Sequence, residues 1–141
     1  MTSMERTLAI IKPDAVGKNR IGVILGHLEN AGFVVRAMRM EKLDSERARE
    51  FYAVHAGRPF YESLVRFMTS GPCVPMVLER ADAVAGLRKT IGATDPSRAE
   101  EGTVRRLHAE SVERNAIHAS DSPENAKREI EFFFPGGGTY A

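Results

Sequence analysis

The sequence has one cysteine, no tryptophan and no long apolar segment. A single thiol, Cys73, excludes an intrachain disulfide and suits a reducing compartment, and its apolar neighbours favour a buried packing role over a nucleophile. No apolar run approaches the roughly 20 residues that a bilayer-spanning helix needs. The first residues, Met1–Arg6, become charged too early for a signal peptide. We therefore expect a cytoplasmic protein with no membrane partner.

Net charge is also nearly absent. The chain carries 20 Lys+Arg and 19 Asp+Glu, a formal charge of +1, which argues against a basic face for duplex binding. We expect no specific nucleic-acid partner, although basic side chains can still gather at one place. The 141 residues suit one compact domain over 1–141, and 43% hydrophobic with 28% charged residues is typical of globular chains.

Glycine-rich phosphate loops and metal-ligand clusters are missing as well. Gly17-Lys18 is followed by Asn19, so no P-loop is present, and no G-x-G-x-x-G precedes a helix. No Cys or His pair has zinc-finger spacing. We predict no metal held by protein side chains alone, and any nucleotide must be bound by side chains.

Hydrophobic patterning predicts short strands at residues 8–11, 33–40 and 73–78, and a short strand at best within 111–122. Helices are predicted at 19–31, from Asp44 or Ser45 to about His55, from Pro59 onward, at 81–91, and after Ser122. Pro75 suggests an edge strand or a bulge. The order predicts an α+β fold, a ferredoxin-like (split βαβ) four-stranded antiparallel sheet covered by helices, with those helices on one face.

Among the four histidines, His118 is the best candidate nucleophile. Its small neighbours leave the ring accessible, Ser120 offers a hydroxyl, and the next helix presents free amides at its start. Neutral imidazole is nucleophilic near neutral pH, since its reference pKa is about 6.5. The alternative is a loop histidine that only hydrogen-bonds the turn. His27 and His55 fit solvated helix positions, and the surroundings of His108 favour neither role.

Several segments in order carry a resemblance to a known family. Asn115–Ser122 closely resembles the active-site stretch of the nucleoside diphosphate kinases, and Thr7–Val16 resembles their opening strand. Phe67–Pro72 and Gly92–Pro96 are similar to further segments of that family. The match extends through almost the whole chain, which makes it far more specific than one short motif.

The resemblance implies phosphate transfer from a nucleoside triphosphate to a nucleoside diphosphate by a ping-pong mechanism, which maintains triphosphate pools. His118 would carry the phosphoryl group, oriented by Glu129 with Ser120 beside it. The implied phosphate ligands are Lys12, Tyr52, Arg88, Thr94 and Arg105. Magnesium is implied as a cofactor that arrives on the nucleotide phosphates.

The resemblance also implies a nucleoside subsite and an assembly. Lys12 and Asn115 would meet the ribose, and the base would stack on Phe60 with Val112 on its other face, which tolerates any base. The implied state is a homo-oligomer, a tetramer or a hexamer. Residue patterns alone leave plainer roles open, because Phe60 could belong to the core and Tyr52 could pack beside Phe51. The arginines could be solvated, and Glu129 could pair with Lys127 or Arg128.

Two departures from the family pattern stand out. Arg106-Leu107-His108 replace a small residue, an acid and an aromatic, and Ala119 replaces a glycine that follows the histidine. A Cβ at position 119 is costly if that residue needs a positive φ. The departures leave open an inactive regulatory relative, and the fold class leaves open a single-strand RNA-binding module. The RNA module needs aromatics on the central strands, which 8–12 and 73–78 lack.

Overall fold

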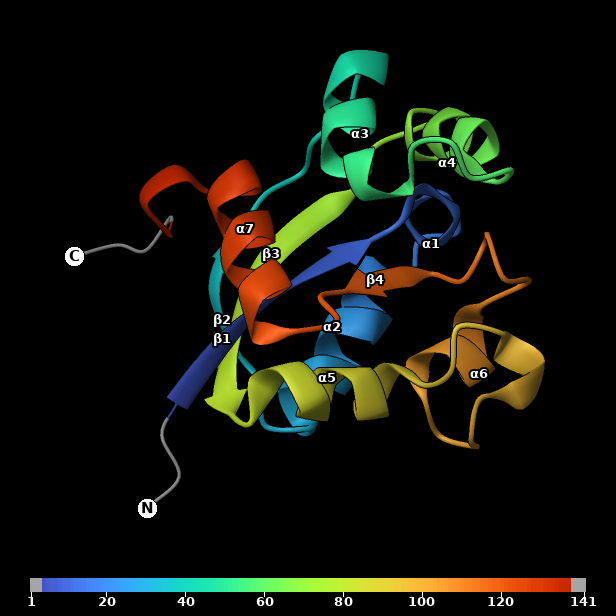
Figure 1. The fold of residues 1–141 in the computed structure, drawn as a ribbon. Coiled ribbons are helices and arrows are strands. Elements are labelled where there is room, and N and C mark those ends of the chain that lie inside the picture. The colour runs from blue at the N-terminus through green and yellow to red at the C-terminus, as the bar shows by residue number, and fades with distance from the viewer. Residues whose placement is uncertain (1–3, 138–141) are drawn as a thin grey trace.

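The computed structural model describes residues 4–137, in which four antiparallel strands form one sheet in the order β2-β3-β1-β4 (Figure 1). The strands are β1 (Met4–Ile11), β2 (Val34–Met38), β3 (Val74–Ala81) and β4 (Ile117–Ala119). The helices are α1 (Pro13–Gly17), α2 (Ile21–Asn30), α3 (Ser45–Phe51), α4 (Tyr61–Met68), α5 (Ala83–Ile91), α6 (Val104–His108) and α7 (Pro123–Phe133). The predicted α+β, ferredoxin-like antiparallel fold is confirmed.

Helices cover both faces of this sheet, so the expectation of helices on one face is wrong. Ala9 and Ile11 of β1 join a buried cluster with residues of α2 and α5. Leu8 and Ile10, which point to the opposite face, join a second buried cluster with residues of α3, α4 and α7. An uninterrupted apolar run such as this one marks a strand that is buried on both faces. A second helical layer therefore has to cover the face opposite α2 and α5.

Pro75 lies in β3, which is an interior strand, so the predicted edge position is wrong. Its carbonyl accepts a hydrogen bond from Arg39 N at 3.2 Å, so its nitrogen faces the same side, toward β2. Because β2 ends at Met38, the missing N–H of Pro75 falls just beyond the last paired residue of that strand. The proline is therefore tolerated without a bulge at its own position; the register shift of this pair lies between Val35 and Ala37.

Side chains cap the helices largely as the sequence predicts. Asp44 accepts from Arg47 N at 2.8 Å at the start of α3, and Ser122 accepts from Asn125 N at 3.1 Å at the start of α7. Such caps satisfy amides that have no helical partner. The helix after Pro59 begins two residues later than expected, at Tyr61. Phe60 therefore precedes α4 and is free to face solvent.

The strand β4 brings the C-terminal third of the chain onto the central sheet. It pairs with β1, with His118 opposite Ile10, and a long connection that contains α6 leads into it from α5 (Figure 1). Lys12 follows β1 directly and lies at the same end of the sheet. Residues far apart in the sequence therefore meet around His118. Within 4–137 no helix is long and apolar enough to span a membrane.

Candidate active site

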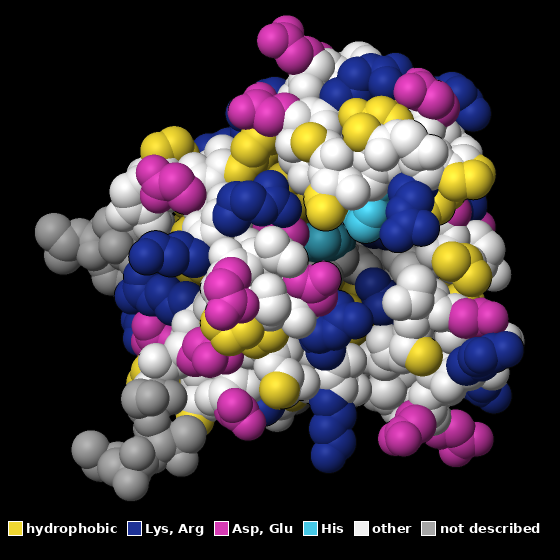
Figure 2. Space-filling model, viewed as in Figure 1, with side chains coloured by type: hydrophobic (Ala, Val, Ile, Leu, Met, Phe, Trp, Pro, Cys, Tyr) yellow, Lys and Arg dark blue, Asp and Glu magenta, His cyan; other side chains and the backbone are white. Residues whose placement is uncertain are grey.

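A cavity of about 570 Å³ opens beside β4. In Figure 2 it is the hollow in which histidine side chains lie among basic ones. All of the predicted site residues except Ser120 line this cavity: Lys12, Tyr52, Phe60, Arg88, Thr94, Arg105, Val112, Asn115, His118 and Glu129. Ser120 is buried behind Glu129 and reaches it by a hydrogen bond. The structure therefore brings the whole predicted set together from parts of the chain that are far apart in the sequence.

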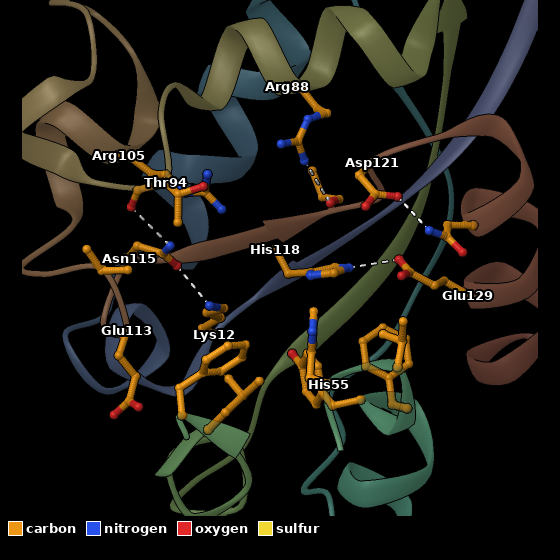
Figure 3. A pocket seen from close by; sticks show the side chains of 18 of the residues that line it. Lys12, His55, Arg88, Thr94, Arg105, Glu113, Asn115, His118, Asp121 and Glu129 are labelled. Atoms are coloured by element: carbon orange, nitrogen blue, oxygen red, sulfur yellow. Dashed lines mark hydrogen bonds and ion pairs between the residues drawn. The ribbon is translucent and has the colours of Figure 1, made fainter. Parts of the chain in front are cut away.

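His118 and Glu129 form a hydrogen-bonded pair at the centre of the cavity (Figure 3). The imidazole Nε2 lies 2.8 Å from Glu129 Oε1, and the Ser120 hydroxyl donates to the same oxygen at 2.7 Å. Burial would raise the pKa of the Glu129 carboxyl, but the hydrogen bonds from His118 and Ser120 outweigh it and hold this pKa below its usual value. Glu129 is thus an ionised acceptor next to the ring.

This pairing determines which ring nitrogen can react. An ionised carboxylate only accepts hydrogen bonds, so in the neutral ring Nε2 carries the proton and Nδ1 keeps its lone pair. No group within residues 4–137 hydrogen-bonds Nδ1 of His118. The His118 side chain is 20% exposed, whereas that of Glu129 is 8% exposed. The carboxylate is buried and fixed, while the ring is accessible from the cavity, an arrangement suited to a nucleophile with a fixed tautomer.

Three basic side chains converge on the same cavity. Lys12 comes from the end of β1, Arg88 from α5 and Arg105 from α6 (Figure 3). Burial, together with the charge of Arg105, lowers the pKa of Lys12 from 10.5 to about 8. Burial and the charge of Arg88 lower the pKa of Arg105 to about 10. These shifts reflect cations that burial and mutual repulsion disfavour, and a polyanion in the cavity offsets both effects.

Arg105 is held in place by main-chain carbonyls. Its two terminal nitrogens donate to Gly92 O at 3.1 Å and to Ile117 O at 2.7 Å, and its buried Nε has no partner within the described residues. The side chain is buried, so the alternative of a solvated surface arginine is wrong for this residue. A guanidinium has five N–H donors. The N–H groups of the two terminal nitrogens that are not used on the carbonyls remain available to a ligand, in a fixed orientation.

The outer part of the cavity is apolar. Phe60 is 46% exposed and Val112 56% exposed, so the alternative that Phe60 belongs to the core is wrong. The segments that carry these two residues are joined, because Ser63 Oγ donates to Glu113 Oε2 at 2.7 Å. The His55 ring lies 5.2 Å from that of Phe60. Two exposed apolar side chains at the mouth of a basic cavity suit a ligand with a planar apolar end and an anionic end.

Tyr52 combines both roles that its sequence position allowed. Its ring packs edge-to-face on Phe51, with centroids 4.8 Å apart. Tyr52 also lines the cavity, and its hydroxyl is buried with no hydrogen-bond partner in the described part of the chain. Burial raises the pKa of this phenol further above its usual value. Tyr52 therefore keeps its proton and presents an unused donor.

Asn115 lies between Lys12 and the Thr94 main chain. Lys12 Nζ donates to Asn115 Oδ1 at 2.8 Å, and Asn115 Nδ2 donates to Thr94 O at 3.3 Å. Both contacts are drawn in Figure 3. Since the hydroxyl of Thr94 is not used in these bonds, it is available to a ligand. The three residues form a connected polar wall opposite the His118–Glu129 pair.

The cavity also includes residues that sequence reasoning did not select. They are Phe51, Val54, His55, Leu64, Glu113, Ala119, Asp121, Asn125 and Arg128. Asp121 could have been predicted as a site residue, because it lies three residues after His118 and just before the cap of α7. The sequence indicated Arg128 only as a partner of Glu129, and the Arg128 side chain does contact Glu129 Oε2 at 3.5 Å. The others become neighbours of His118 only through packing and give no local signal.

The departure at Ala119 causes no backbone strain. Positive φ occurs at Asn19, Asp82 and Ala116 among the non-glycine residues described, and Ala119 is an ordinary strand residue in β4. The departure at Arg106–His108 falls within α6, with Leu107 exposed and His108 Nε2 buried without a hydrogen-bond partner in the described region. Arg105 at the start of this helix still reaches the cavity. The altered residues therefore leave the basic side chain in place.

Comparison with known proteins identifies the family. A family model described as nucleoside diphosphate kinase matches residues 5–138. The chain belongs to the nucleoside diphosphate kinase family. The prediction of this family, and of a phosphotransferase, is confirmed by that match and by the relatives described next.

Relatives are similar over nearly their whole length. A nucleoside diphosphate kinase of Chlorobium luteolum is 60% identical over 131 residues, which cover 93% of this chain and 94% of that protein. One of Burkholderia thailandensis is 53% identical over 139 residues, 99% of each chain. The crystal structure of the Aquifex aeolicus nucleoside diphosphate kinase superposes with a TM-score of 0.94 at 44% identity, covering 98% of this chain and all of that one (100%).

Metal ligation by the protein itself finds no support in the described region. Within residues 4–137 no group of three or more His, Cys, Asp or Glu side chains could hold a metal ion. The Asp121 carboxylate lines the cavity but already accepts from Asn125 Nδ2 at 2.6 Å.

Proposed function

We propose that this protein transfers the γ-phosphate of a nucleoside triphosphate to a nucleoside diphosphate through a phosphohistidine on His118. The observation that carries the proposal is the pairing of His118 Nε2 with the buried Glu129 carboxylate, which leaves Nδ1 free beside three basic side chains. Membership of the nucleoside diphosphate kinase family supports the same reaction. The roles that we assign to the individual site residues are part of the same proposal.

In the first half-reaction the lone pair of Nδ1 forms a bond to the γ-phosphorus, in line with the bridging oxygen. The bond from phosphorus to that oxygen breaks, and the diphosphate leaves with the electron pair. The ring becomes positively charged because Nε2 keeps its proton, and the Glu129 carboxylate at 2.8 Å stabilises this charge. Ser120 fixes the carboxylate from behind. The second half-reaction is the reverse, with a different diphosphate as acceptor.

Phosphate oxygens are bound by Lys12, Arg88 and Arg105, and by the hydroxyls of Tyr52 and Thr94. Hydrogen bonds from charged donors to phosphate are worth roughly 1.5–3 kcal/mol each. Magnesium, when bound with the nucleotide, supplies further neutralisation of phosphate charge. Because one phosphoanhydride is consumed as another forms, the protein's task is to position and neutralise the reactants.

The nucleoside lies toward the apolar mouth of the cavity. Lys12 and Asn115 contact the ribose, and the base stacks between Phe60 and Val112. Stacking uses the π-face that every base has, so we expect broad base tolerance. The function in the cell is then to maintain nucleoside triphosphate pools. We expect the enzyme to act in the cytoplasm as a single domain over residues 1–141. We expect a homo-oligomer, a tetramer or a hexamer, which light scattering tests.

The RNA-binding alternative has little support in this fold. A sheet that binds single-stranded RNA needs aromatic side chains on an open face. Here helices cover both faces, and β1 is buried from Thr7 to Ile11. The inactive-relative alternative rested on Ala119 and on Arg106–His108. Neither departure displaces a proposed catalytic group, so we favour the active enzyme.

Two-substrate kinetics test the proposal. Initial rates are measured with ATP varied at several fixed concentrations of a thymidine or guanosine diphosphate, in the presence of magnesium. Parallel double-reciprocal lines are expected, because each half-reaction releases product before the next substrate binds. The matched control, His118→Asn, should be inactive. Intersecting lines, or an active His118→Asn variant, overturn the phosphohistidine mechanism, and a wild type that transfers no phosphate overturns the function.

A further inference from the structure

A strained turn lies immediately before the proposed nucleophile. Ile117 N donates to Asn115 O at 2.9 Å, which closes a three-residue γ-turn around Ala116. Ala116 has a φ of 75°, in the region that favours glycine and that an L-residue with a Cβ rarely adopts. Residues persist in such conformations only when their surroundings hold them there. The contacts around Ala116 therefore decide whether this turn forms.

The contacts that hold the turn come from the opposite end of the chain. Asp14 Oδ2 accepts a hydrogen bond from Ala116 N at 3.1 Å, and Lys12 N donates to Ala116 O at 2.8 Å. Both main-chain polar groups of Ala116 are thus bound by Lys12, which precedes α1, and by Asp14 in the first turn of α1. Ala116 is fully buried, so no solvent can replace either partner without rearrangement.

The turn sets the relative positions of several site groups. On its N-terminal side is Asn115, which contacts Lys12 Nζ and the Thr94 main chain. On its C-terminal side, Ile117 O accepts from Arg105 at 2.7 Å, and the next residue is His118. A change in the turn therefore shifts the basic groups relative to the histidine. Misplacement by about 1 Å can slow a positioned reaction by roughly a hundredfold.

Asp14 has no contact with the cavity that explains its burial. It does not line the cavity, its carboxyl is buried, and its Oδ1 has no hydrogen-bond partner among residues 4–137. Burial raises the pKa of this carboxyl above its usual value, so the environment disfavours its charged form. The hydrogen bond from Ala116 N opposes this effect of burial more strongly than the charge of Lys12 or the nearby amides of Ala15 and Asp14 do, so the Asp14 carboxylate and the turn stabilise each other.

We propose that Asp14 is a positioning residue for the phosphoryl transfer, and that it acts by holding Ala116 in the γ-turn that places Asn115 and His118. The inference rests on the proposed function for its kinetic readout. It predicts an energetic coupling between positions 14 and 116, because glycine adopts a positive φ without help. The contribution of Asp14 should shrink once residue 116 no longer needs to be held.

A double-mutant cycle measures this coupling. The rate of His118 phosphorylation by ATP in a single turnover is compared for wild type, Asp14→Ala, Ala116→Gly and the double variant. Asp14→Ala removes the hydrogen bond that holds Ala116 at its strained positive φ, and we expect about a tenfold slower rate. In the Ala116→Gly background the same change should slow the rate by less than about threefold. An equal loss in both backgrounds, or no loss in either, overturns the proposal.

Asp14→Asn separates the hydrogen bond from the charge. The Asp14 charge also acts on Lys12, so loss of that charge is the competing explanation. The amide oxygen of asparagine can still accept from Ala116 N, and we expect Asp14→Asn to stay within about threefold of wild type. A variant as slow as Asp14→Ala shows that the charge matters instead, and overturns the proposal.

Urea unfolding of the same four proteins gives a readout that needs no activity. Asp14→Ala should lower the unfolding midpoint less in the Ala116→Gly background than in wild type. If Asp14→Ala alone does not fold, a folded double variant supports the proposal and an unfolded one overturns it. An inactive wild type removes the proposed function, while this coupling still tests the contact between Asp14 and the turn.

Discussion

Replacing Glu129 by glutamine tests the proposed activation of His118 with little change in shape. Glu129 Oε1 accepts from His118 Nε2 at 2.8 Å and from Ser120 at 2.7 Å, and the side chain is only 8% exposed. Glutamine keeps one oxygen but loses the charge that stabilises the positively charged ring. If its amide nitrogen faces the ring, it donates to Nε2 and moves the proton to Nδ1, which removes the reactive lone pair.

The size of the effect follows from the hydrogen bond that is lost. Hydrogen bonds to charged groups contribute about 1.5–3 kcal/mol. At about 1.4 kcal/mol for each factor of ten in rate, Glu129→Gln should slow phosphorylation of His118 roughly 10- to 150-fold. The matched control, Ser120→Ala, removes the other bond to the same oxygen while it keeps the charge, and should slow the reaction less.

Rapid-quench measurement of the first half-reaction gives the rate of His118 phosphorylation without contributions from product release. Circular dichroism and a urea midpoint confirm that each variant is folded. A folded Glu129→Gln protein that phosphorylates at the wild-type rate refutes the reasoning. A Ser120→Ala variant slower than Glu129→Gln also refutes it, because the charge would then not be the dominant contribution.

Three further changes test other parts of the site. Lys12 has a pKa of about 8 in the folded protein against 10.5 for a free lysine, so kcat/KM should fall as pH rises through about 8 and the cation is lost. Between these values Lys12 is protonated in the unfolded chain but not in the folded one, so its contribution to the free energy of unfolding should rise from about pH 8 to 10.5. Burial raises the pKa values of Cys73 and Tyr52, which act in the opposite direction over part of this range, so urea series of wild type and Lys12→Met are compared at each pH, and an equal pH dependence contradicts the shift. Phe60→Ala should raise the Kd for diphosphates roughly 5- to 150-fold by calorimetry, with the fold intact, since stacking contributes about 1–3 kcal/mol per base; an unchanged Kd places the base elsewhere. Gly92 has a φ of 92°, and a Cβ there lies 2.6 Å from the Thr103 hydroxyl. Gly92→Ala should therefore lower the free energy of unfolding by about 1–3 kcal/mol in urea titration, and an equally stable variant contradicts this account.

Much of the fold could be predicted because its strands and helix caps have local signals. The apolar run of β1, the Asp44 cap of α3 and the Ser122 cap of α7 each follow from adjacent residues. Helix α6 was not predicted, because Val104–His108 is only five residues long and mainly polar, with no apolar periodicity. The prediction of an edge strand from Pro75 was wrong, because the sequence around Pro75 does not show where the neighbouring strand β2 ends.

The candidate site likewise contains some residues that the sequence could indicate and others that it could not. His118 could be selected from its neighbours, and the family resemblance supplied the other proposed residues. Residue types alone favoured the wrong answer for Phe60, which precedes α4 and faces the cavity. Asp14 gave no signal, because its contact with Ala116 joins residues 102 positions apart. Long-range contacts of this kind depend on packing of the whole chain.

The central claim is that a phosphoryl group resides on His118 between the two half-reactions. Intact-protein mass spectrometry at neutral pH, after incubation with ATP and magnesium but no acceptor, tests it most directly. We predict the gain of one phosphoryl group, acid-labile, mapped to His118 by fragmentation and removed on addition of a nucleoside diphosphate. An unmodified protein that still transfers phosphate, or a phosphoryl group on another residue that a diphosphate discharges, contradicts the account.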